Sequence, residues 1–156
     1  MFVKEVMKTE VQILKKGMTH RQAAEFLLKN KISGAPVIDE QGQLIGLVSE
    51  KDIFKAIYPS YRSFYESPEL YLDWDELEKN AHAASDKKVE DFMAERLITT
   101  TPETPILKVG GLMVATGIHR VPVVDIKGNL VGMVSRGDIY RAILREHFGL
   151  WEKKNN

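Results

Sequence analysis

The hydrophobic and polar positions at the start of the chain switch between strand-like and helix-like spacing. Short apolar runs bounded by turn residues predict strands, and apolar residues that recur every three or four positions predict helices. Thr19, followed three residues later by Gln22, is typical of a helix start. The continuous apolar run at 44–48 predicts burial on both faces. The pattern predicts strands at 11–14, 35–38 and 44–48, a helix from Thr19 to about Asn30, a turn at 39–42, and a helix from Ser49 to Ile57.

The same pattern occurs a second time at a constant offset of 86 residues, as from Pro36 to Pro122. The segments 36–53 and 122–139 match without a gap. An internal repeat defines the building unit of a fold, and a unit that occurs twice favours a paired module over a solenoid. The matched positions include Asp39 and Asp125, Gly42 and Gly128, Gly46 and Gly132, Ser49 and Ser135, and Asp52 and Asp138.

The first helix of the second repeat has an unusual composition. Pro105 is expected at the first helical position, directly after Thr104. Gly110 and Gly111 lie inside this helix, where each glycine costs about 1 kcal/mol relative to alanine. We expect close packing of the two repeats at these glycines. The later elements are a strand at 130–134 and a helix from Arg136 to about Phe148.

The segment between the repeats is acidic and aromatic. This composition argues against a flexible linker, so we expect a structured connector that packs over one repeat. The alternative is a surface that docks a partner or forms a dimer. Asp73 or Asp75 is expected to cap a helix that runs through His82. The aromatic residues are Tyr58, Tyr61, Phe64, Tyr65, Tyr71 and Trp74. The predicted division is repeat one at 1–58, the connector at 59–88, repeat two at 89–148 and a tail at 149–156.

Composition argues against several classes of function. Lysine plus arginine and aspartate plus glutamate both number 22, a balance that argues against broad electrostatic binding of nucleic acid. Cysteine is absent, so the chain has no disulfide or thiolate site. No apolar run approaches the ~20 residues of a membrane span, and the charged N-terminal segment does not resemble a secretory signal. We therefore expect a cytoplasmic protein without membrane or nucleic-acid partners.

No catalytic arrangement is evident in the sequence. The histidines fall in different predicted elements without metal-ligand spacing, and the chain has neither a nucleophile elbow nor a glycine-rich phosphate loop. We expect no enzyme activity, no catalytic residue and no metal site. The histidines are His20, His82, His119 and His147.

A serine followed three positions later by an aspartate opens the closing helix of each repeat. As a purely structural feature, this pair caps a helix and complements its dipole. A helix N-terminus that follows a buried strand can also hold an anion, and a carboxylate there can accept two hydrogen bonds from the vicinal hydroxyls of a ribose. The two roles are compatible. The pairs are Ser49 with Asp52 and Ser135 with Asp138.

The residues before each strand proline form a second candidate site. An apolar strand entry with exposed backbone can frame a flat base, and neighbouring positive charge can hold phosphate. The alternative is a set of solvated turn residues. Only the second repeat offers positive charge here, from His119 and Arg120. The two segments are Ile32, Ser33, Gly34 and Ala35, and Ile118, His119, Arg120 and Val121.

These repeats resemble a tandem pair of CBS domains, also called a Bateman module, over about residues 3–58 and 89–144. The resemblance rests on Gly-Ala-Pro-Val-Ile-Asp at 34–39, on His-Arg-Val-Pro-Val-Val-Asp at 119–125, and on the Ser-x-x-Asp-Ile that follows in each repeat. It implies an α/β (α+β) fold of two β-α-β-β-α repeats packed through their sheets in pseudo-twofold symmetry. It also implies clefts between the repeats that bind adenosine-containing ligands.

The resemblance implies roles for individual residues. The two aspartates would bind ribose, the serines ribose or phosphate, and His119 with Arg120 phosphate. Each base would lie across the symmetry axis from its aspartate, so Asp138 would share a site with 32–35, and Asp52 with 118–121. Lys51 and Arg136 follow the serines, and the unequal charges of the repeats predict two sites of unequal affinity. The expected base contacts are Ile32, Ser33, Gly34 and Ala35 with Thr9 and Val11, and Ile118 and Val121 with Leu97.

The sequence thus predicts a stand-alone regulatory module that binds an adenine nucleotide (AMP, ADP or ATP) in one or both clefts. The ligand would bridge the repeats and favour one relative orientation, which changes a surface read by an unidentified regulated protein. The resemblance further implies a homodimer. Two alternatives stay open: another adenosyl ligand, S-adenosylmethionine or NAD, and a structural oligomerisation module that binds no ligand. Arg120 favours a phosphate-bearing ligand over a cationic sulfonium.

Overall fold

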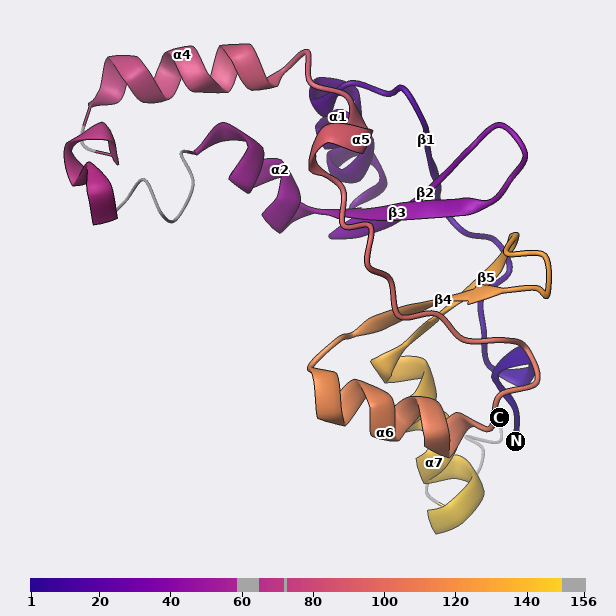
Figure 1. Ribbon diagram of the computed structural model, residues 1–156. Helices are drawn as coiled ribbons and strands as arrows, with labels where there is room; N and C mark the ends of the chain where they lie inside the picture. Colours follow the sequence, from indigo (N-terminus) through magenta and orange to yellow (C-terminus); the bar gives the residue numbers. More distant parts are fainter. Residues whose placement is uncertain (59–64, 72, 150–156) are drawn as a thin grey trace, which may run out of the picture. The chain divides into compact units, whose positions relative to one another are not determined.

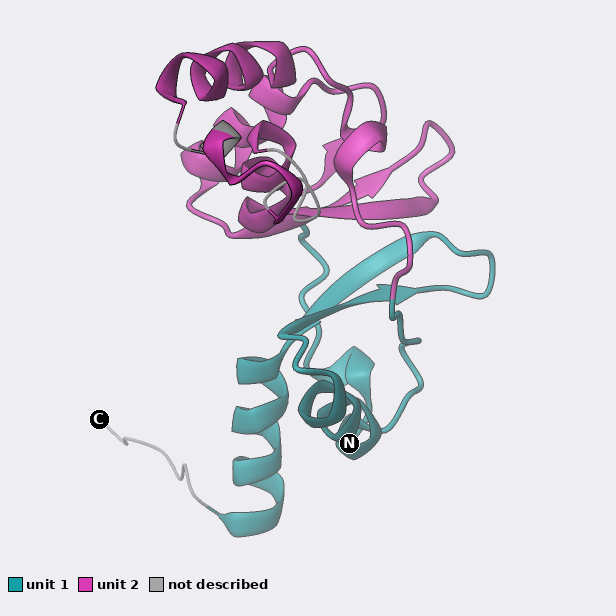
Figure 2. Cartoon of the chain, turned by 60° about the vertical axis from the view of Figure 1, so that its left-hand side comes forward, with its two compact units in different colours: residues 1–11, 98–156 teal, residues 12–97 magenta. Residues whose placement is uncertain are grey.

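The structure is a computed structural model that describes residues 1–58, 65–71 and 73–149. The chain divides into two compact units, which are coloured separately in Figure 2. Unit 2 is the continuous stretch 12–97, and unit 1 combines 1–11 with 98–156. Tyr61, Phe64 and the part of the predicted tail beyond Gly149 lie outside the described residues.

Unit 2 contains a three-stranded sheet in the order β1-β2-β3 (Figure 1). β1 runs parallel to β2, and β2 runs antiparallel to β3. The elements are β1 (Leu14–Lys15), α1 (His20–Asn30), β2 (Gly34–Ile38), β3 (Leu44–Ser49), α2 (Glu50–Ile57), η2 (Pro68–Tyr71), α4 (Trp74–Ala84) and α5 (Val89–Phe92). The buried core consists of Leu14, Ala23, Leu27, Ala35, Val37, Val48 and Val89.

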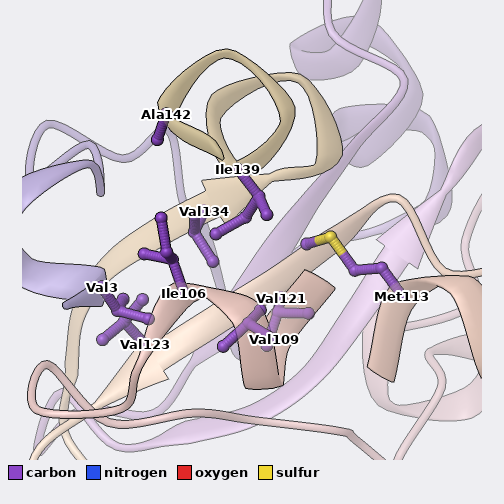
Figure 3. Packing of buried hydrophobic residues seen from close by; sticks show 9 residues of the cluster. All are labelled: Val3, Ile106, Val109, Met113, Val121, Val123, Val134, Ile139 and Ala142. Carbon is purple, nitrogen blue, oxygen red and sulfur yellow. The ribbon is translucent and has the colours of Figure 1, made fainter. Parts of the chain in front are cut away.

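Unit 1 repeats this plan with an antiparallel pair, β4 and β5. Thr100 forms a parallel bridge to Val123, at the positions that correspond to the pairing of Leu14 with Val37. The elements are η1 (Val3–Glu5), α6 (Ile106–Thr116), β4 (Arg120–Val124), β5 (Leu130–Ser135) and α7 (Arg136–Phe148). The buried core, drawn in Figure 3, consists of Val3, Ile106, Val109, Met113, Val121, Val123, Val134, Ile139 and Ala142.

Most helices begin and end where the hydrophobic pattern predicts. Thr19 Oγ1 accepts a hydrogen bond from Gln22 N at 3.2 Å, and Gln22 Oε1 accepts one from Thr19 N at 2.9 Å, so the predicted capping box is confirmed. α1 then ends at Asn30, and its C-cap Lys31 has a left-handed φ of 53°. Asp73 caps α4, since its Oδ1 accepts a hydrogen bond from Glu76 N at 3.2 Å. Local side-chain chemistry therefore sets these boundaries.

Three details differ from the predictions. The strand expected at 11–14 is limited to Leu14–Lys15, because only these residues pair with β2. Pro105 is the N-cap of α6 rather than its first helical residue, and its ψ of 136° is extended. β3 is not buried throughout: Gly46 and Val48 are buried, while its other residues are half-buried.

The two glycines of α6 have different surroundings within unit 1, and the expected contact between repeats stays a prediction. A Cβ added to Gly110 would lie 3.2 Å from Ile139 Cγ2, so this glycine admits α7 of its own unit. A Cβ added to Gly111 would meet no atom within 4 Å. Gly110 therefore has a packing role, and Gly111 has no steric one.

Gly111→Ala is expected to raise the free energy of unfolding by about 1 kcal/mol, because alanine restricts the unfolded chain and stabilises a helix interior. Gly110→Ala is expected to raise the free energy of unfolding by a smaller amount, since its methyl group would press on Ile139. Urea unfolding of both variants measures the difference. A Gly111→Ala protein less stable than the parent would contradict the assignment of open space at this position.

The first segments of the two repeats are exchanged between the sheets. Lys8 forms an antiparallel bridge with Met133, and the corresponding residue Ala94 forms one with Leu47. In each bridge the backbone N–H and C=O groups are paired in both directions at 2.9–3.0 Å. Residues 1–11 of the first repeat thus complete unit 1, and the start of the second repeat, including α5, completes unit 2.

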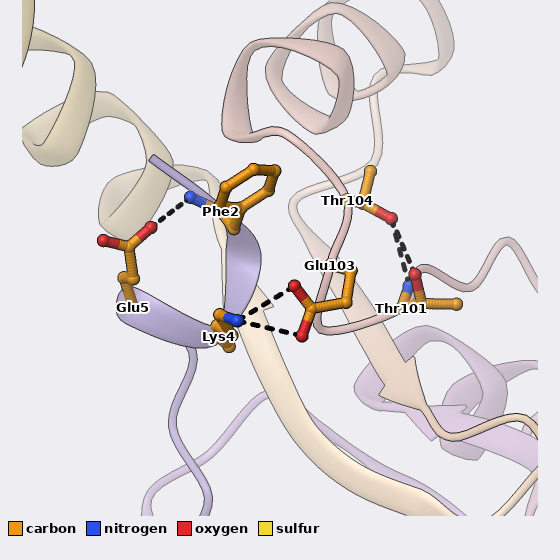
Figure 4. A network of polar contacts seen from close by, with 6 residues as sticks. All are labelled: Phe2, Lys4, Glu5, Thr101, Glu103 and Thr104. Atoms are coloured by element: carbon orange, nitrogen blue, oxygen red, sulfur yellow. Dashed lines mark hydrogen bonds and ion pairs between the residues drawn. The ribbon is translucent and has the colours of Figure 1, made fainter.

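Hydrogen bonds connect the N-terminal segment to the loop before α6 (Figure 4). Lys4 Nζ donates hydrogen bonds to both carboxylate oxygens of Glu103, at 2.9 and 3.0 Å. The backbone N–H of Val3 donates to Thr104 O at 2.9 Å. Val3 is fully buried in the core of unit 1, so this segment is an integral part of that unit.

The connector is helical over part of its length, and α4 packs against α2. A cavity of ≈ 270 Å³ lies between these two helices, lined by residues that include Ile57, Asn80 and Lys87. Two of the connector's aromatic side chains are strongly exposed, Tyr65 at 68% and Trp74 at 71%. The helix therefore packs as expected, while these two aromatic side chains expose most of their surface.

Candidate functional site

The Ser135–Asp138 pair, here called the unit 1 cap, joins the end of β5 to the start of α7. Asp138 N donates to Ser135 Oγ at 3.2 Å. In return Asp138 Oδ2 accepts from Ser135 N at 3.0 Å and from Ser135 Oγ at 2.5 Å. The extended backbone of Ser135 places its side chain over the free N–H groups of the first helical turn. The carboxylate is thereby fixed in one orientation.

The Ser49–Asp52 pair, the unit 2 cap, has the same geometry at the start of α2. Asp52 Oδ2 accepts from Ser49 N at 2.8 Å and from Ser49 Oγ at 2.7 Å. Asp52 N lies 3.4 Å from Ser49 Oγ. The capping role expected from the sequence is thus present in both repeats.

The two carboxylates differ in their remaining oxygen. Arg141 Nη2 donates to Asp138 Oδ1 at 2.7 Å, and Asp138 is only 8% exposed. Lys55 stands at the corresponding position of the first repeat, and within the described part of the chain it forms no ion pair with Asp52. Asp52 is half-buried. Asp138 is therefore the more tightly held of the two.

The pKa of Asp138 lies below its ordinary value of 3.8. Burial raises the pKa of this carboxyl, but hydrogen bonds from Ser135, the charge of Lys8 and a hydrogen bond from Arg141 outweigh that effect. Lys8 reaches the carboxylate's surroundings through the exchanged segment, which bonds to β5 at Met133.

This lowered pKa predicts a pH dependence of stability. A depressed carboxyl pKa stabilises the fold at pH values above the unfolded pKa, and that contribution is lost as the pH falls through the folded pKa. The free energy of unfolding should therefore decrease at pH values below about 4. In the Asp138→Asn variant this decrease should be smaller. Urea unfolding between pH 3 and 7 compares the two proteins. An equally steep drop in the variant would assign the acid sensitivity to other carboxyls.

The structure brings the residues before each strand proline next to the cap of the same repeat. Gly34 is the strand partner of Ser49, and Glu50 N donates to Ser33 O at 3.0 Å. A Cβ at Gly34 would lie 2.9 Å from Val48 O, so the backbones approach closely here. Ser33 is exposed at the rim of the unit 2 cap.

The second repeat shows the same arrangement with larger side chains. Arg120 is the strand partner of Ser135, and Arg136 N donates to His119 O at 2.8 Å. His119, Arg120 and Arg136 are all exposed. The backbone of the predicted phosphate-contacting residues His119 and Arg120 therefore adjoins the unit 1 cap of their own unit.

The remaining candidates divide between the units. Thr9 and Val11 belong to unit 1 and follow Lys8 in the exchanged segment, whereas Leu97 belongs to unit 2. The predicted sharing of one site by Asp138 and 32–35, and of another by Asp52 and 118–121, joins residues of different units and stays a prediction.

Two cationic residues near Asp138, Arg141 and Lys8, were missing from the sequence-based site. Arg141 could have been found, because a residue three positions after an aspartate lies on the same face of a helix. Lys8 could not, because its place depends on the exchange of segments. Among the described residues, no three histidine, aspartate or glutamate side chains are grouped as metal ligands. No helix in the same ranges is long and apolar enough to span a bilayer.

Known proteins share both the sequence pattern and the fold. The family model named CBS domain matches residues 3–59 and 89–145. Protein MJ1426 of Methanocaldococcus jannaschii is 35% identical over 155 residues, which is 92% of each chain. The chloroplastic CBS domain-containing protein CBSX1 of Arabidopsis thaliana is 32% identical over 144 residues, which is 88% of this chain and 61% of that protein.

Solved structures extend the comparison to ligand complexes. The crystal structure of CBSX2 in complex with AMP has a TM-score of 0.69 at 29% identity, and the match covers 92% of this chain and 96% of that one. The CBS domain pair of protein MJ0100, in complex with 5′-methylthioadenosine and S-adenosyl-L-methionine, has a TM-score of 0.67 at 26% identity, with coverage of 92% and 95%.

A further relative is an enzyme, homoserine O-acetyltransferase of Methanohalobium evestigatum, at 25% identity over 142 residues. The match takes in 91% of this chain but only 24% of that protein. The chain thus corresponds to about a quarter of the enzyme's length.

Proposed function

We propose that this chain, which belongs to the CBS-domain family as a tandem pair of CBS domains, is a regulatory module that binds an adenine nucleotide. The observation that carries the proposal is the pair of serine–aspartate caps. Each fixes a carboxylate at a helix N-terminus, next to the backbone that precedes a strand proline. The complexes of CBSX2 with AMP and of the MJ0100 pair with adenosyl ligands support an adenosine-containing ligand.

The chemistry of each cap suits the ribose of such a ligand. The aspartate already accepts hydrogen bonds from its serine and remains able to accept more, since each carboxylate oxygen has two lone pairs. The vicinal hydroxyls of a ribose are matching donors. Cations beside the unit 1 cap favour AMP, ADP or ATP over S-adenosylmethionine, whose sulfonium is positively charged. NAD carries ribose and phosphate groups as well and is the second candidate.

We propose that regulation operates through the relative orientation of the two repeats. A ligand that contacts both repeats would stabilise one orientation by its difference in affinity for the alternatives. The regulated protein would then read the altered surface. The chain carries no proposed catalytic residue, and we place its action in the cytoplasm, although a relative is chloroplastic.

A homodimer is part of the proposal, and matched exposed side chains support it. Leu28 on α1 and Val114 on α6 occupy corresponding positions and are 81% and 84% exposed. Phe54 on α2 and Tyr140 on α7 also correspond, at 60% and 62%. Large apolar side chains at equivalent exposed positions fit a partner with the same internal repeat, such as a second copy.

Light scattering of Phe54→Asp/Tyr140→Asp should show the mass of a monomer, and an unchanged mass would place the interface elsewhere.

Isothermal titration calorimetry of protein stripped of carried-over ligand tests the ligand proposal. AMP, ADP, ATP, S-adenosylmethionine and NAD are titrated separately. We expect binding of at least one adenine nucleotide. The absence of a binding signal for all five ligands would favour the alternative, a structural oligomerisation module in which both aspartates serve only as helix caps.

A further inference from the structure

A groove in unit 1 lies between α6 and the segment that precedes this helix. Its volume of ≈ 630 Å³ is within the range of small-molecule sites. Thr100 forms a parallel bridge to Val123, so the groove follows the outer edge of the sheet beside β4. Threonines of the segment 99–104 line one side, and α6 lines the other. Its lining, taken from the described residues, includes no residue of either cap.

The groove has room because small residues replace the long side chains of the first repeat. Gly111 and Ala115 line it, and they stand where α1 carries Glu25 and Lys29. A Cβ added to Gly111 would meet no atom within 4 Å. A glycine inside a helix lowers the stability of that helix, and no packing neighbour explains its presence here. An open groove that receives a ligand does explain it.

Thr100 contributes a hydroxyl that has no hydrogen-bond partner among the described residues. Thr100 is only 8% exposed, and it lines the groove. No side-chain oxygen of the described residues is completely enclosed without a partner, so the Thr100 Oγ1 is reached from the groove. The corresponding residue of the first repeat is Leu14, which is fully buried in its core. A nearly buried hydroxyl without a partner is unfavourable, and a hydrogen-bonding ligand would remove that penalty.

Lys108 gives the groove a positive charge. It is the one charged residue of the lining, its side chain is exposed, and it forms no ion pair with any described residue. A lysine ammonium has only donors to offer, and a carboxylate has only acceptors. Val109 and Leu112 add apolar surface beside it. The groove thus combines one cation, one unused hydroxyl and an apolar wall.

We propose that this groove binds a small carboxylic acid with an apolar body, such as a medium-chain fatty acid. The carboxylate pairs with the Lys108 ammonium and accepts a hydrogen bond from the Thr100 hydroxyl. The apolar body lies against Leu112, in the space left by Gly111 and Ala115. This site is additional to the two caps, and it does not depend on the nucleotide function proposed above.

Titration of the protein with octanoate, followed by its backbone amide signals in NMR spectra, tests the proposal. We expect saturable shifts at Thr99, Thr101 and Gly111. Octylammonium has the same chain and the opposite charge, and it should bind more weakly. Lys108→Gln should weaken octanoate binding about 2- to 5-fold, as expected for an exposed ion pair. Thr100→Val should weaken it on the order of 10-fold, the loss expected for a hydrogen bond to a charged group.

Thr100→Val also separates binding from a structural role. Valine has the shape of threonine without its hydroxyl, so the variant should be at least as stable as the parent in urea unfolding. A clear loss of stability would assign the hydroxyl to the fold and overturn its role in the groove.

Lys29→Gln is the matched control for a lost positive charge. Lys29 is exposed on α1 in the other unit, and its substitution should leave octanoate affinity unchanged. The proposal would be overturned by an equal loss in Lys29→Gln and Lys108→Gln, by equal binding of octanoate and octylammonium, or by the absence of saturable shifts with octanoate. Displacement of octanoate by AMP would also overturn it, because octanoate would then occupy a nucleotide site.

Discussion

Replacing both aspartates with asparagine, in Asp52→Asn/Asp138→Asn, is expected to weaken nucleotide binding by about 10- to 100-fold or more. Each substitution removes a charged acceptor for the ribose hydroxyls, and a hydrogen bond to a charged group contributes about 1.5–3 kcal/mol. The fold should survive, since the amide oxygen of asparagine can still accept the hydrogen bond that each aspartate accepts from the backbone N–H of its serine. Calorimetry gives the affinity, and thermal unfolding gives the stability of the same samples.

Asp91→Asn is the appropriate control for this double variant. Asp91 Oδ2 accepts a hydrogen bond from Lys88 N at 2.9 Å at the start of α5, so Asp91 has the same capping role without belonging to either candidate site. Its substitution should leave nucleotide affinity unchanged. If the double variant binds as tightly as the parent, the assignment of ribose to the two caps is wrong, whatever the ligand.

Gly46→Ala is expected to destabilise the protein by about 1–3 kcal/mol, the usual cost of overpacking a core. A Cβ at Gly46 would overlap the side chain of Met93, whose Cγ would lie 2.7 Å away. The matching substitution Gly132→Ala would press on Met7 and on the backbone oxygen of Lys8 at 3.1 Å. Both glycines therefore make room for the methionine of an exchanged segment. Urea unfolding measures the loss.

A double-variant comparison isolates the cause. Met93→Ala removes the side chain that Gly46→Ala would meet, so the two effects should not add, and the combined variant should be more stable than their sum predicts. Gly111→Ala serves as the reference for an unobstructed glycine. Additive losses from Gly46→Ala and Met93→Ala would show that the strain lies elsewhere in β3.

The sequence was sufficient to predict the elements of this fold where local chemistry decides them. The helix caps accept hydrogen bonds from backbone N–H groups within their own helical turn, as at Thr19, Ser49 and Ser135. Their roles can therefore be predicted from sequence spacing alone. Strand pairing between residues that are distant in the sequence could not be predicted in this way. Lys8 and Ala94 are equivalent in sequence, and nothing in either repeat indicates that each joins the sheet of the other.

The candidate site was predictable to a similar extent. The serines, the aspartates and the segments before the prolines were identified from the repeat, and strand register brings them together within each unit. The contribution of Lys8 depends on the exchange, and that of Arg141 on its position one helical turn after Asp138. The packing of Gly110 against α7 was not predicted, because propensity alone does not reveal which neighbour a missing side chain leaves room for.

The arrangement of the units along the chain sets an order for folding during synthesis. Unit 2 is one uninterrupted stretch and can complete its core once residue 97 has left the ribosome. Unit 1 cannot, because the bridge between Lys8 and Met133 joins opposite ends of the sequence. Contacts of such long range are slow to form. The first eleven residues therefore remain without their strand partner until β5 has been synthesised. A ribosome stalled within the second repeat would hold a folded unit 2 and an N-terminal segment that has no sheet to join.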